Sequence, residues 1–519
     1  MPQTDSESDS DSVRTPSAPS SIPTPSATPS IPTPRAWAVV LTACAGQFLV
    51  VLDVSVVNVA LPSMRTDLGL SALGLQWVLN AYAIAFAGFM LLGGRASDLY
   101  GRKAMFLLGL GLFTGASVAG GLAQEGWQLV AARAVQGLGA AVLSPATLTL
   151  VTAAVPAGAA RTRAIGTWTA VGAAGGAAGG FVGGLLVDLL SWRWVLLINV
   201  PVGGLVLVGA LLWLRESRTG AGRRLDLPGA VLVTAGLATL AYGIVQTEEA
   251  GWTDPTTLLT LLGGLALLGV FVAVEARTAE PLMRLGIFRT RAVSAANVAI
   301  LLCGSSSFGM WFFMTTYAQS VLAYTPLQAG LALVPSSLSV VLGSKLAPYL
   351  MPIVGARNLA VIGALVGAAG FAWQSTLTAD GTFLGTILGP GILMMAGLGL
   401  ATTPLAALAT SSASPADAGL VSGLVNTSRT MGGALGLAVL STIAAAATPA
   451  VTSAAPDPAS LVPGYAMAFR AATGVLIGAA VLMLLWLPKP AKPTQSAQAE
   501  QPEQPAQPDR PSKSVVRRG

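Results

Sequence analysis

The chain contains no histidine, only two cysteines and few charged residues, and each shortage excludes a class of site. Without histidine, no imidazole can carry a proton. Cys44 and Cys303 both fall in long apolar stretches, so a structural disulfide is not expected and a metal site would have too few ligands. The sequence has no GxxxxGKS or GxxxxGKT run to hold a nucleotide. We therefore expect no cofactor and no work driven by nucleotide hydrolysis.

The charged residues are too few for a soluble protein of this length. They make up 10% of the chain, whereas hydrophobic residues make up 53% and the mean hydropathy is +0.70. A soluble domain carries about 25% charged residues. The apolar residues fall in repeated runs of roughly 20, which is the length that a helix needs to cross a bilayer. This pattern predicts an all-α polytopic membrane protein in contact with lipid.

Fourteen such runs can be drawn along the chain. Two of them begin with a capping side chain followed by a first-turn proline, at Asp254-Pro255 and Thr325-Pro326. The runs cover approximately residues 37–61, 74–94, 104–124, 128–151, 165–187, 194–214, 228–246, 255–275, 292–318, 326–346, 358–377, 382–405, 418–446 and 465–487.

The loops between the runs differ in charge on alternate sides. Arginine and lysine concentrate in one set, near residues 95–103, 161–163, 215–224, 277–291 and 345–357, and acidic residues concentrate in the other. The basic set is expected in the cytoplasm. An even number of spans then places both termini there, in a multi-pass protein of the plasma membrane. The net charge of +6 is explained in this way and predicts no nucleic-acid partner.

A repeated segment divides the chain. Residues 94–103 (GRASDLYGRK) place one glycine at a helix end and a second before basic residues, and residues 343–357 repeat this plan in degraded form. Transporters built from parallel halves have such repeats, with a substrate site between the halves. The predicted organisation is a disordered tail (1–35), a six-helix bundle (36–214), two inserted helices (215–291), a second six-helix bundle (292–487) and a second disordered tail (488–519), with the two pseudo-symmetric bundles around a central cavity.

Four segments in order are similar to one family. Residues 94–103 and the pattern from Arg133 to Ala141 (RxxQGxGAA) resemble motifs of the major facilitator superfamily. Residues 52–62 (LDVSVVNVALP) and residues 191–201 (SWRW to INVP) resemble its fourteen-span drug:proton antiporter branch. The resemblance covers essentially residues 36–487. It implies the major facilitator fold and transport by alternating access, in which the two halves rock about the substrate.

Asp53 is the only acidic residue well inside an apolar run, and a carboxylate there is costly unless it has a function. It lies nine residues before Pro62, roughly 13 Å below the outer surface, and Arg133 lies six residues inside Trp127, roughly 9 Å below it. The two are expected to pair and to carry proton coupling. The alternative is that Arg133 extends to the outer interface. Asn58 is about 140° around the helix from Asp53 and is expected to bond another helix.

Other positions are assigned by the resemblance. The equivalent helices of the family line the central cavity, and aromatic packing or an interfacial belt is the alternative for any single side chain. The cavity residues implied are Gln76, Trp77, Asn80, Gln136, Trp311, Phe312, Tyr317 and Asn426. A cytoplasmic gate that latches the halves together is predicted, with an ordinary tight turn as the alternative, from Gly94, Asp98, Gly101, Arg102, Lys103 and Arg429.

The fifth run is dense in glycine at spacings of three and four, which favours close helix packing. The family's antiporter signature reads Gly-Pro-x-x-Gly-Gly here, and this chain has glycine at position 180 instead of proline, so packing is retained but the proline kink is not. The packing residues expected are Gly172, Gly176, Gly179, Gly180, Gly183 and Gly184.

The predicted function is a proton-coupled secondary exporter of hydrophobic or cationic drugs, or of an antibiotic, acting as a monomer. The alternative is a transporter of one small metabolite, such as an amino acid, a peptide or a siderophore. A membrane enzyme would need catalytic side chains clustered at one membrane face, and no histidine, cysteine pair or acidic pair provides them.

Overall fold

The computed structural model describes residues 34–156, 159–216, 226–278, 281–412, 418–448 and 458–488. The tails predicted for residues 1–35 and 488–519 lie outside these ranges, apart from residues 34, 35 and 488. Within the described residues the chain is helical and contains no strand.

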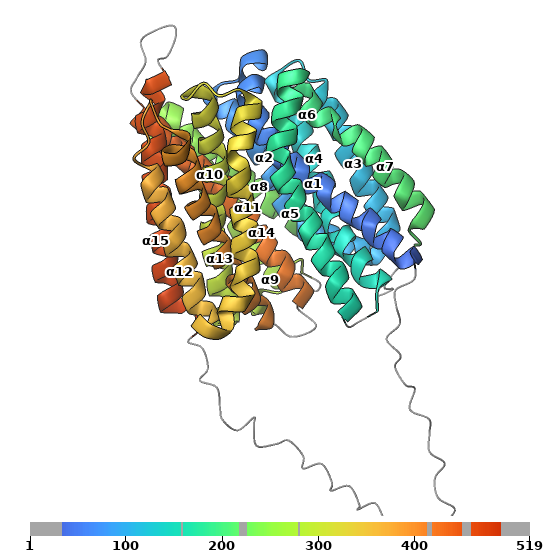
Figure 1. Cartoon of the computed structure of the whole chain (residues 1–519). Helices are drawn as coiled ribbons and strands as arrows, with labels where there is room; N and C mark the ends of the chain where they lie inside the picture. Colours follow the sequence, from blue (N-terminus) through green and yellow to red (C-terminus); the bar gives the residue numbers. More distant parts are fainter. Residues whose placement is uncertain are drawn as a thin grey trace, which may run out of the picture.

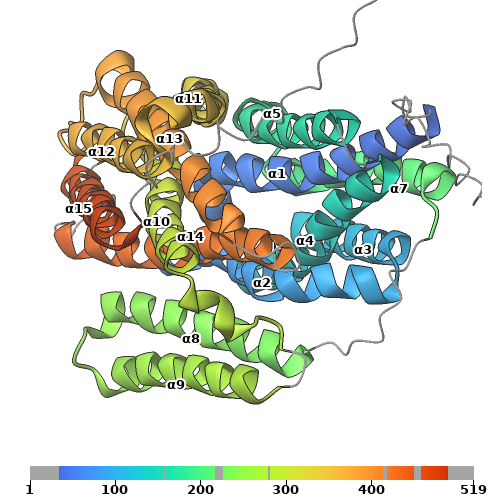
Figure 2. The same ribbon diagram turned by 90° about the horizontal axis from the view of Figure 1, so that it is seen from below.

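The helices form two bundles and a separate pair (Figures 1 and 2). The N-terminal bundle contains α1 (Pro34–Leu68), α2 (Ala72–Tyr100), α3 (Arg102–Gly121), α4 (Gly126–Ala154), α5 (Ala159–Leu189), α6 (Arg193–Leu197) and α7 (Asn199–Trp213). The pair contains α8 (Leu227–Ala250) and α9 (Pro255–Arg277). After a 3-10 turn, η1 (Leu285–Arg289), the C-terminal bundle contains α10 (Arg291–Ser320), α11 (Pro326–Val354), α12 (Ala356–Gln374), the π-helical turn η2 (Phe383–Leu388), α13 (Gly389–Ser411), α14 (Ala418–Ala447), the 3-10 turn η3 (Pro458–Leu461) and α15 (Val462–Trp486).

Fourteen helical segments in the described residues are long and apolar enough to cross a membrane, as the sequence predicts. Short α6 and α7 together form the sixth, and η2 with α13 forms the twelfth. The predicted caps are present. Asp254 accepts hydrogen bonds from the amides of Thr256 (2.8 Å) and Thr257 (3.1 Å). Thr325 and Gln328 form a reciprocal capping box at the start of α11.

The first helix is longer than the apolar run that predicts it. It passes through Pro62 and ends at Leu68. Near this end Asp67 accepts hydrogen bonds from Trp192 Nε1 (2.9 Å) and Arg193 Nη1 (2.5 Å). The segment 191–194 therefore anchors the end of α1 to the start of the sixth span.

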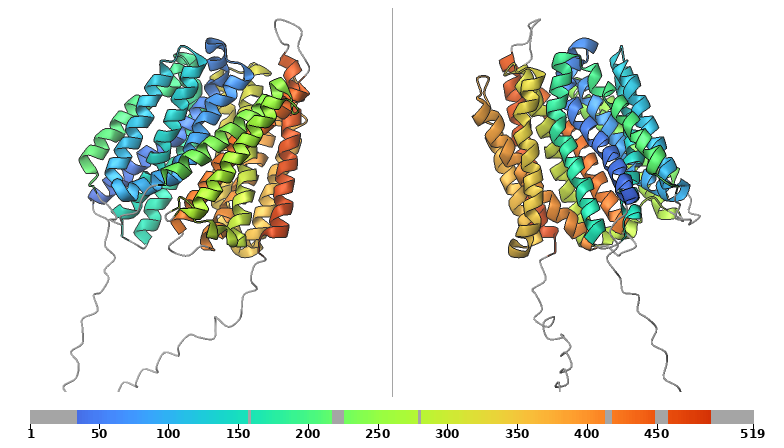
Figure 3. Two further views of the ribbon diagram at one scale, coloured as in Figure 1. Left: turned by 180° about the vertical axis from the view of Figure 1, so that it is seen from behind. Right: turned by 45° about the vertical axis from the view of Figure 1, so that its right-hand side comes forward.

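The predicted repeat appears as a pair of matched turns. Gly101 joins α2 to α3 with φ 109° and ψ 139°, and Gly355 joins α11 to α12 with φ 85° and ψ 142°. A positive φ of this size favours glycine. We call the end of the molecule that carries these two turns the basic end, because Arg102, Lys103 and Arg357 lie beside them. The start of α1 and the end of α15 lie at the same end (Figure 3).

At the opposite end, where α10 leads to α11, the two bundles meet. A Cβ atom on Gly330 of α11 would lie 2.0 Å from the carbonyl oxygen of Gly180 of α5. The Asp188 carboxylate accepts a hydrogen bond from the Leu327 amide (3.2 Å). Gln319 of α10 donates to the Val59 carbonyl of α1 (2.8 Å). These contacts join the two bundles at this end.

The glycines of α5 face two neighbours instead of forming one stripe. Cβ atoms added at Gly175, Gly179 and Gly183 would meet α1, where the nearest atoms are 3.0, 2.3 and 2.9 Å away. Cβ atoms added at Gly180 and Gly184 would instead meet α11 at 3.0 and 2.5 Å. Of the remaining predicted packing residues, Gly172 and Gly176 face α1 more loosely, with nearest distances of 3.5 Å each.

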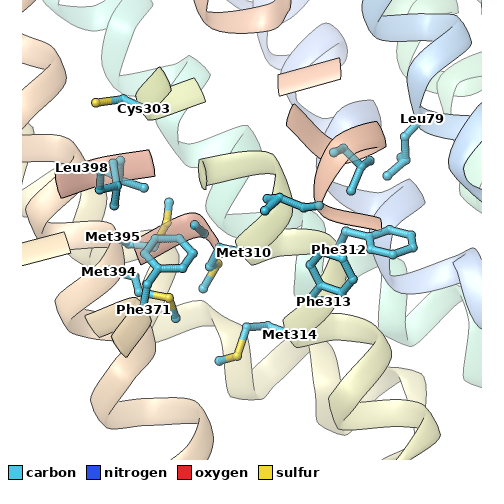
Figure 4. Packing of buried hydrophobic residues seen from close by; sticks show 14 of the residues in the cluster. Leu79, Cys303, Met310, Phe312, Phe313, Met314, Phe371, Met394, Met395 and Leu398 are labelled. Carbon is cyan, nitrogen blue, oxygen red and sulfur yellow. The ribbon is translucent and has the colours of Figure 1, made fainter. Parts of the chain in front are cut away.

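The core of the C-terminal bundle is rich in methionine and phenylalanine, and includes Met310, Met314, Met394 and Phe371 (Figure 4). Such flexible and polarisable side chains fill irregular gaps between helices. Cys303 is buried in the same core as a free thiol, and Cys44 is buried and free in the N-terminal bundle, consistent with the expected lack of a disulfide.

A buried ion-pair network as the candidate functional site

Asp53 and Arg133 form an ion pair inside the N-terminal bundle. Asp53 is 0% exposed and Arg133 is 1% exposed, and Arg133 Nη1 lies 2.6 Å from Asp53 Oδ2. A reciprocal capping box between Glu125 and Gln128 starts α4 two turns before Arg133 and so sets its depth. The predicted pairing is present. The alternative, in which Arg133 extends to the outer interface, is wrong for this structure because the side chain is buried.

The second carboxylate oxygen, Oδ1, accepts two hydrogen bonds. Gln136 Nε2 donates to Asp53 Oδ1 (2.7 Å), and Asn199 Nδ2 donates to the same oxygen (2.8 Å). Both amides also donate to Ser117 Oγ, at 2.8 and 3.1 Å. Ser117 in turn donates to the Phe113 carbonyl (2.8 Å). Side chains from α1, α3, α4 and α7 thus form one hydrogen-bonded network around the Asp53 carboxylate.

Arg133 is held on the other sides as well. Its Nη1 donates to Gln136 Oε1 (2.6 Å) and its Nε donates to the Val78 carbonyl of α2 (3.1 Å). The guanidinium lies over the Tyr82 ring, 4.3 Å from its centroid, in a cation–π contact. A buried charge needs such partners, since an unpaired one is strongly unfavourable.

This network is able to respond to a single proton. A carboxylate accepts hydrogen bonds only, whereas a carboxylic acid also donates one. Protonation of Asp53 would therefore remove the counter-charge of Arg133 and add a buried O–H donor that needs an acceptor. Removing one member of a buried ion pair costs about 3–5 kcal/mol, so the packing around α1 and α4 must adjust. In the described residues no group of three or more His, Cys, Asp or Glu could hold a metal ion.

Two members of the network are missed by sequence reasoning. Asn199 lies within the family-like segment 191–201, and its position as an amide in an apolar run could have marked it. Ser117 carries no such signal, because serine is common in membrane helices. Gln136, assigned above to the cavity, instead belongs to this network and is buried. Within the described part of the chain Asn58 does not bond another helix, since its Nδ2 donates to the Val54 carbonyl of α1 itself (2.8 Å).

Several other predicted cavity residues have different surroundings. Trp77 lies 6.4 Å from the Tyr242 ring of α8, on the side of the inserted pair. The Tyr317 hydroxyl donates to the Thr378 carbonyl (2.7 Å) within the C-terminal bundle, so its role there is packing. Phe312 packs edge-on against Phe313 at 5.1 Å. Trp311 is partly buried against the same core.

Three predicted cavity residues lie on the facing helices α2 and α14. Gln76 and Asn80 of α2 are buried, and Gln76 Oε1 and both amide atoms of Asn80 have no hydrogen-bond partner among the described residues. Asn426 of α14 donates to Met90 Sδ of α2 (3.1 Å), so it joins the two bundles. These three therefore remain candidates for the region between the bundles.

The predicted gate is only partly visible. The Asp98 side chain and residues 413–417, at the predicted start of the thirteenth span, lie outside what the structure describes. In the described residues Lys103 makes no hydrogen bond or ion pair with the C-terminal bundle: its Nζ donates to the Leu211 carbonyl of α7 (3.5 Å) and its amide donates to Glu216, just after α7 (3.3 Å). Glu216 also accepts from the Ala104 amide (3.0 Å) and so caps α3.

Two further gate residues, Gly94 and Arg429, have contacts within their own half. Arg429 Nη2 donates to Asn426 Oδ1 (2.7 Å) on the same helix. A Cβ on Gly94 would lie 3.6 Å from Pro145 of α4. Lys103 therefore does not make the predicted contact between the halves in the described residues, and its contacts hold α3 against α7 instead.

We expect Asn199→Ala to reduce transport without abolishing it. The change removes one of three side chains that donate to Asp53, and a hydrogen bond to a charged group contributes about 1.5–3 kcal/mol. Gradient-driven efflux should fall about tenfold at equal protein level, in proportion to such a loss. Asn58→Ala is the matched control because Asn58 bonds only its own helix. Equal efflux in the two variants would contradict a role for Asn199.

Comparisons with known proteins identify the family of this chain. The family model described as Major Facilitator Superfamily matches residues 43–437. The "Cephamycin export protein CmcT" of Amycolatopsis lactamdurans is 47% identical over 446 residues, which cover 85% of this chain and 89% of that protein. The "Puromycin resistance protein pur8" of Streptomyces alboniger is 40% identical over 454 residues, covering 86% and 90%.

Solved structures share the fold at low sequence identity. A bacterial homolog of the human lysosomal transporter Spinster, crystallised in an inward-facing and unoccupied conformation, superposes with a TM-score of 0.59 and 18% identity, covering 88% of this chain and 100% of that one. Matched relatives and family alike are transporters, which argues against an enzyme. With fourteen spans in a 6 + 2 + 6 arrangement, the chain belongs to the Major Facilitator Superfamily.

Proposed function

We propose that this protein is a proton-coupled exporter that moves an antibiotic or a hydrophobic, cationic drug out of the cell by alternating access. The observation that carries the proposal is the fully buried Asp53 carboxylate, which accepts hydrogen bonds from Arg133, Gln136 and Asn199. The names of the export and resistance proteins that match along nearly the whole chain support the substrate class.

The basic end faces the cytoplasm in this proposal. Arginine and lysine concentrate there, as expected for cytoplasmic loops of a plasma-membrane protein. Both termini are then cytoplasmic. The end at which Gly180 meets Gly330 faces outward, so the described conformation is closed to the outside.

Helix α1 is the element that would couple the proton to this closure. It carries Asp53 and, six residues further on, the Val59 carbonyl that accepts from Gln319 of the other bundle. Between them, Ser55 donates to the Gly176 carbonyl of α5 (2.8 Å). A proton on Asp53 that shifts α1 therefore acts on both helices that make the outer contact. Coupling requires only that proton and drug have different affinities for the two states.

The protein acts as a monomer in this proposal, since each half supplies its own part of the pathway. The competing proposal, a transporter for a single amino acid, peptide or siderophore, shares the fold and the proton site. It differs in substrate alone, so substrate assays separate the two.

The proposal is tested in everted membrane vesicles, whose exposed face is cytoplasmic. With an acidic lumen, a fluorescent cationic drug should accumulate inside and protons should leave, and a protonophore should abolish both signals because the gradient is the only energy source. Accumulation that survives the protonophore would contradict proton coupling. Gradient-dependent uptake of a dipeptide or amino acid, with no drug transport, would favour the competing proposal.

A further inference from the structure

Helix α15 has a lipid-facing stripe that contains one cation. Its buried side faces α10, α12 and α14, and it lies at the edge of the C-terminal bundle (Figure 2). The exposed side is apolar or glycine at every described position except Arg470. It consists of Pro463, Met467, Arg470, Gly474, Ile477, Gly478, Val481, Leu484, Leu485 and Trp486.

Arg470 makes no hydrogen bond or ion pair with any part of the chain that the structure describes. Its side chain is exposed beside a groove of about 550 Å³ that runs between α15 and the ends of α12 and α14. The groove is lined on the α12 side by Ser375, Thr376 and Leu377 and on the α15 side by Met467 and Arg470. An arginine on lipid-facing surface is costly unless its charge is matched.

Depth arithmetic places this groove at a membrane boundary. Arg470 lies sixteen residues before Trp486, or about 24 Å along the helix. We take Trp486 as the position of the cytoplasmic interface. Arg470 then lies roughly 6 Å below the outer edge of a hydrocarbon core about 30 Å thick, and its side chain can reach that edge. Helix α12, with Ser375 just past its end, independently spans about 27 Å from Ala356. Both helices place the groove at the outer phosphate level in the proposed orientation.

The polar groups in the groove are a charged donor on one side and hydroxyl acceptors on the other. Arg470 is a free donor with a positive charge. Ser375 and Thr376 already donate their hydroxyl protons to the carbonyls of Ala372 and Trp373, at 2.7 Å each, so only acceptor lone pairs remain. The ends of α12 and α14 also turn the negative ends of their helix dipoles towards the groove. One side therefore suits an anion and the other a cationic donor.

We propose that this groove binds the headgroup of an aminophospholipid of the outer leaflet, phosphatidylethanolamine in chemical class. The phosphate pairs with the Arg470 guanidinium, and the ammonium lies against the hydroxyl oxygens of Ser375 and Thr376. One acyl chain follows the apolar stripe below Arg470. A choline headgroup offers no N–H donor for the hydroxyl side, and a glycerol headgroup offers no positive charge to the helix ends. The assignment of the groove to the outer leaflet rests on the proposed function, whereas the groove and its lining residues do not.

Native mass spectrometry of the purified full chain, titrated separately with phosphatidylethanolamine, phosphatidylglycerol and phosphatidylcholine, tests the proposal without any transport step. The wild type should hold one phosphatidylethanolamine more tightly than either other lipid. Arg470→Gln should weaken that site about tenfold, as expected for loss of a charge-assisted contact to phosphate. The matched control is Arg277→Gln, since Arg277 lines a separate groove at the basic end of α9.

A second variant checks the hydroxyl side. Ser375→Val with Thr376→Val should reduce the preference for ethanolamine over choline while leaving binding of the phosphate intact. Equal binding of the three lipids to the wild type, or an unchanged site in Arg470→Gln, would overturn the proposal. Loss of lipid binding only in Arg277→Gln would also overturn it, because the site would then lie elsewhere. None of these results depends on drug efflux, so failure of the exporter assignment is distinguishable.

Discussion

Substitution Asp53→Asn is expected to abolish gradient-driven efflux while the protein is still made and inserted. Asparagine has nearly the same shape as aspartate but cannot bind or release a proton near neutral pH. Because Asp53 is the only acid in the described network, no neighbouring side chain can take over. The measurement is drug efflux in vesicles with an imposed proton gradient, normalised to the amount of transporter.

A stability control is essential because Asp53→Asn leaves the Arg133 guanidinium without its counter-charge. That loss is expected to cost about 3–5 kcal/mol. The double variant Asp53→Asn, Arg133→Gln removes both charges and should recover most of the melting temperature of the purified protein, yet remain inactive. Asp53→Glu retains a carboxylate and should keep partial activity. Wild-type efflux in Asp53→Asn at equal protein level would refute the proton-carrier role.

Substitution Gly330→Ala should be the second large effect, since it should prevent the two halves from meeting at the end that faces outward in the proposed orientation. The added Cβ would lie 2.0 Å from the Gly180 oxygen and 2.6 Å from its carbonyl carbon. Both atoms belong to backbone, so no rotamer change relieves the clash and the helices must separate. Efflux should fall more than about tenfold, because the closed state loses more than 1.4 kcal/mol relative to the open one.

The state shift can be measured directly. A cysteine placed at Leu327, next to the contact, should react faster with a membrane-impermeant maleimide in Gly330→Ala than in the unmodified background. Gly115→Ala is the matched control, because its Cβ would meet nothing within 4 Å. Unchanged labelling together with unchanged efflux would show that the contact is not needed for closure.

The fold was largely predictable because span length and loop charge are set by the bilayer. The runs near 20 residues, the repeat about Gly101 and Gly355 and the two inserted helices all follow from local pattern. The ion pair was predictable for a related reason. A helix rises by a fixed amount per residue, about 1.5 Å, so the depths of Asp53 and Arg133 can be compared from the sequence alone.

Rotation about each helix axis was much harder to predict. Depth does not say that Gln136 turns towards Asp53, that Tyr317 turns into its own bundle or that Lys103 reaches α7. These side-chain orientations depend on which helices are neighbours. Asn199 and Ser117 come from two helices far from Asp53 in sequence, and only the assembled bundle brings them together.

The two glycine faces of α5 imply two separate selective requirements on one helix. Gly175, Gly179 and Gly183 face α1 of the same half, so a larger residue there is harmful throughout the transport cycle. Gly180 and Gly184 face α11 of the other half, so a larger residue there is harmful only while the halves touch. Glycine at position 180 lets the backbones of α5 and α11 come within contact distance. Natural variation at these last two positions would therefore adjust how long the exporter stays closed to the outside, and thus its turnover, without altering the drug or the proton that it carries.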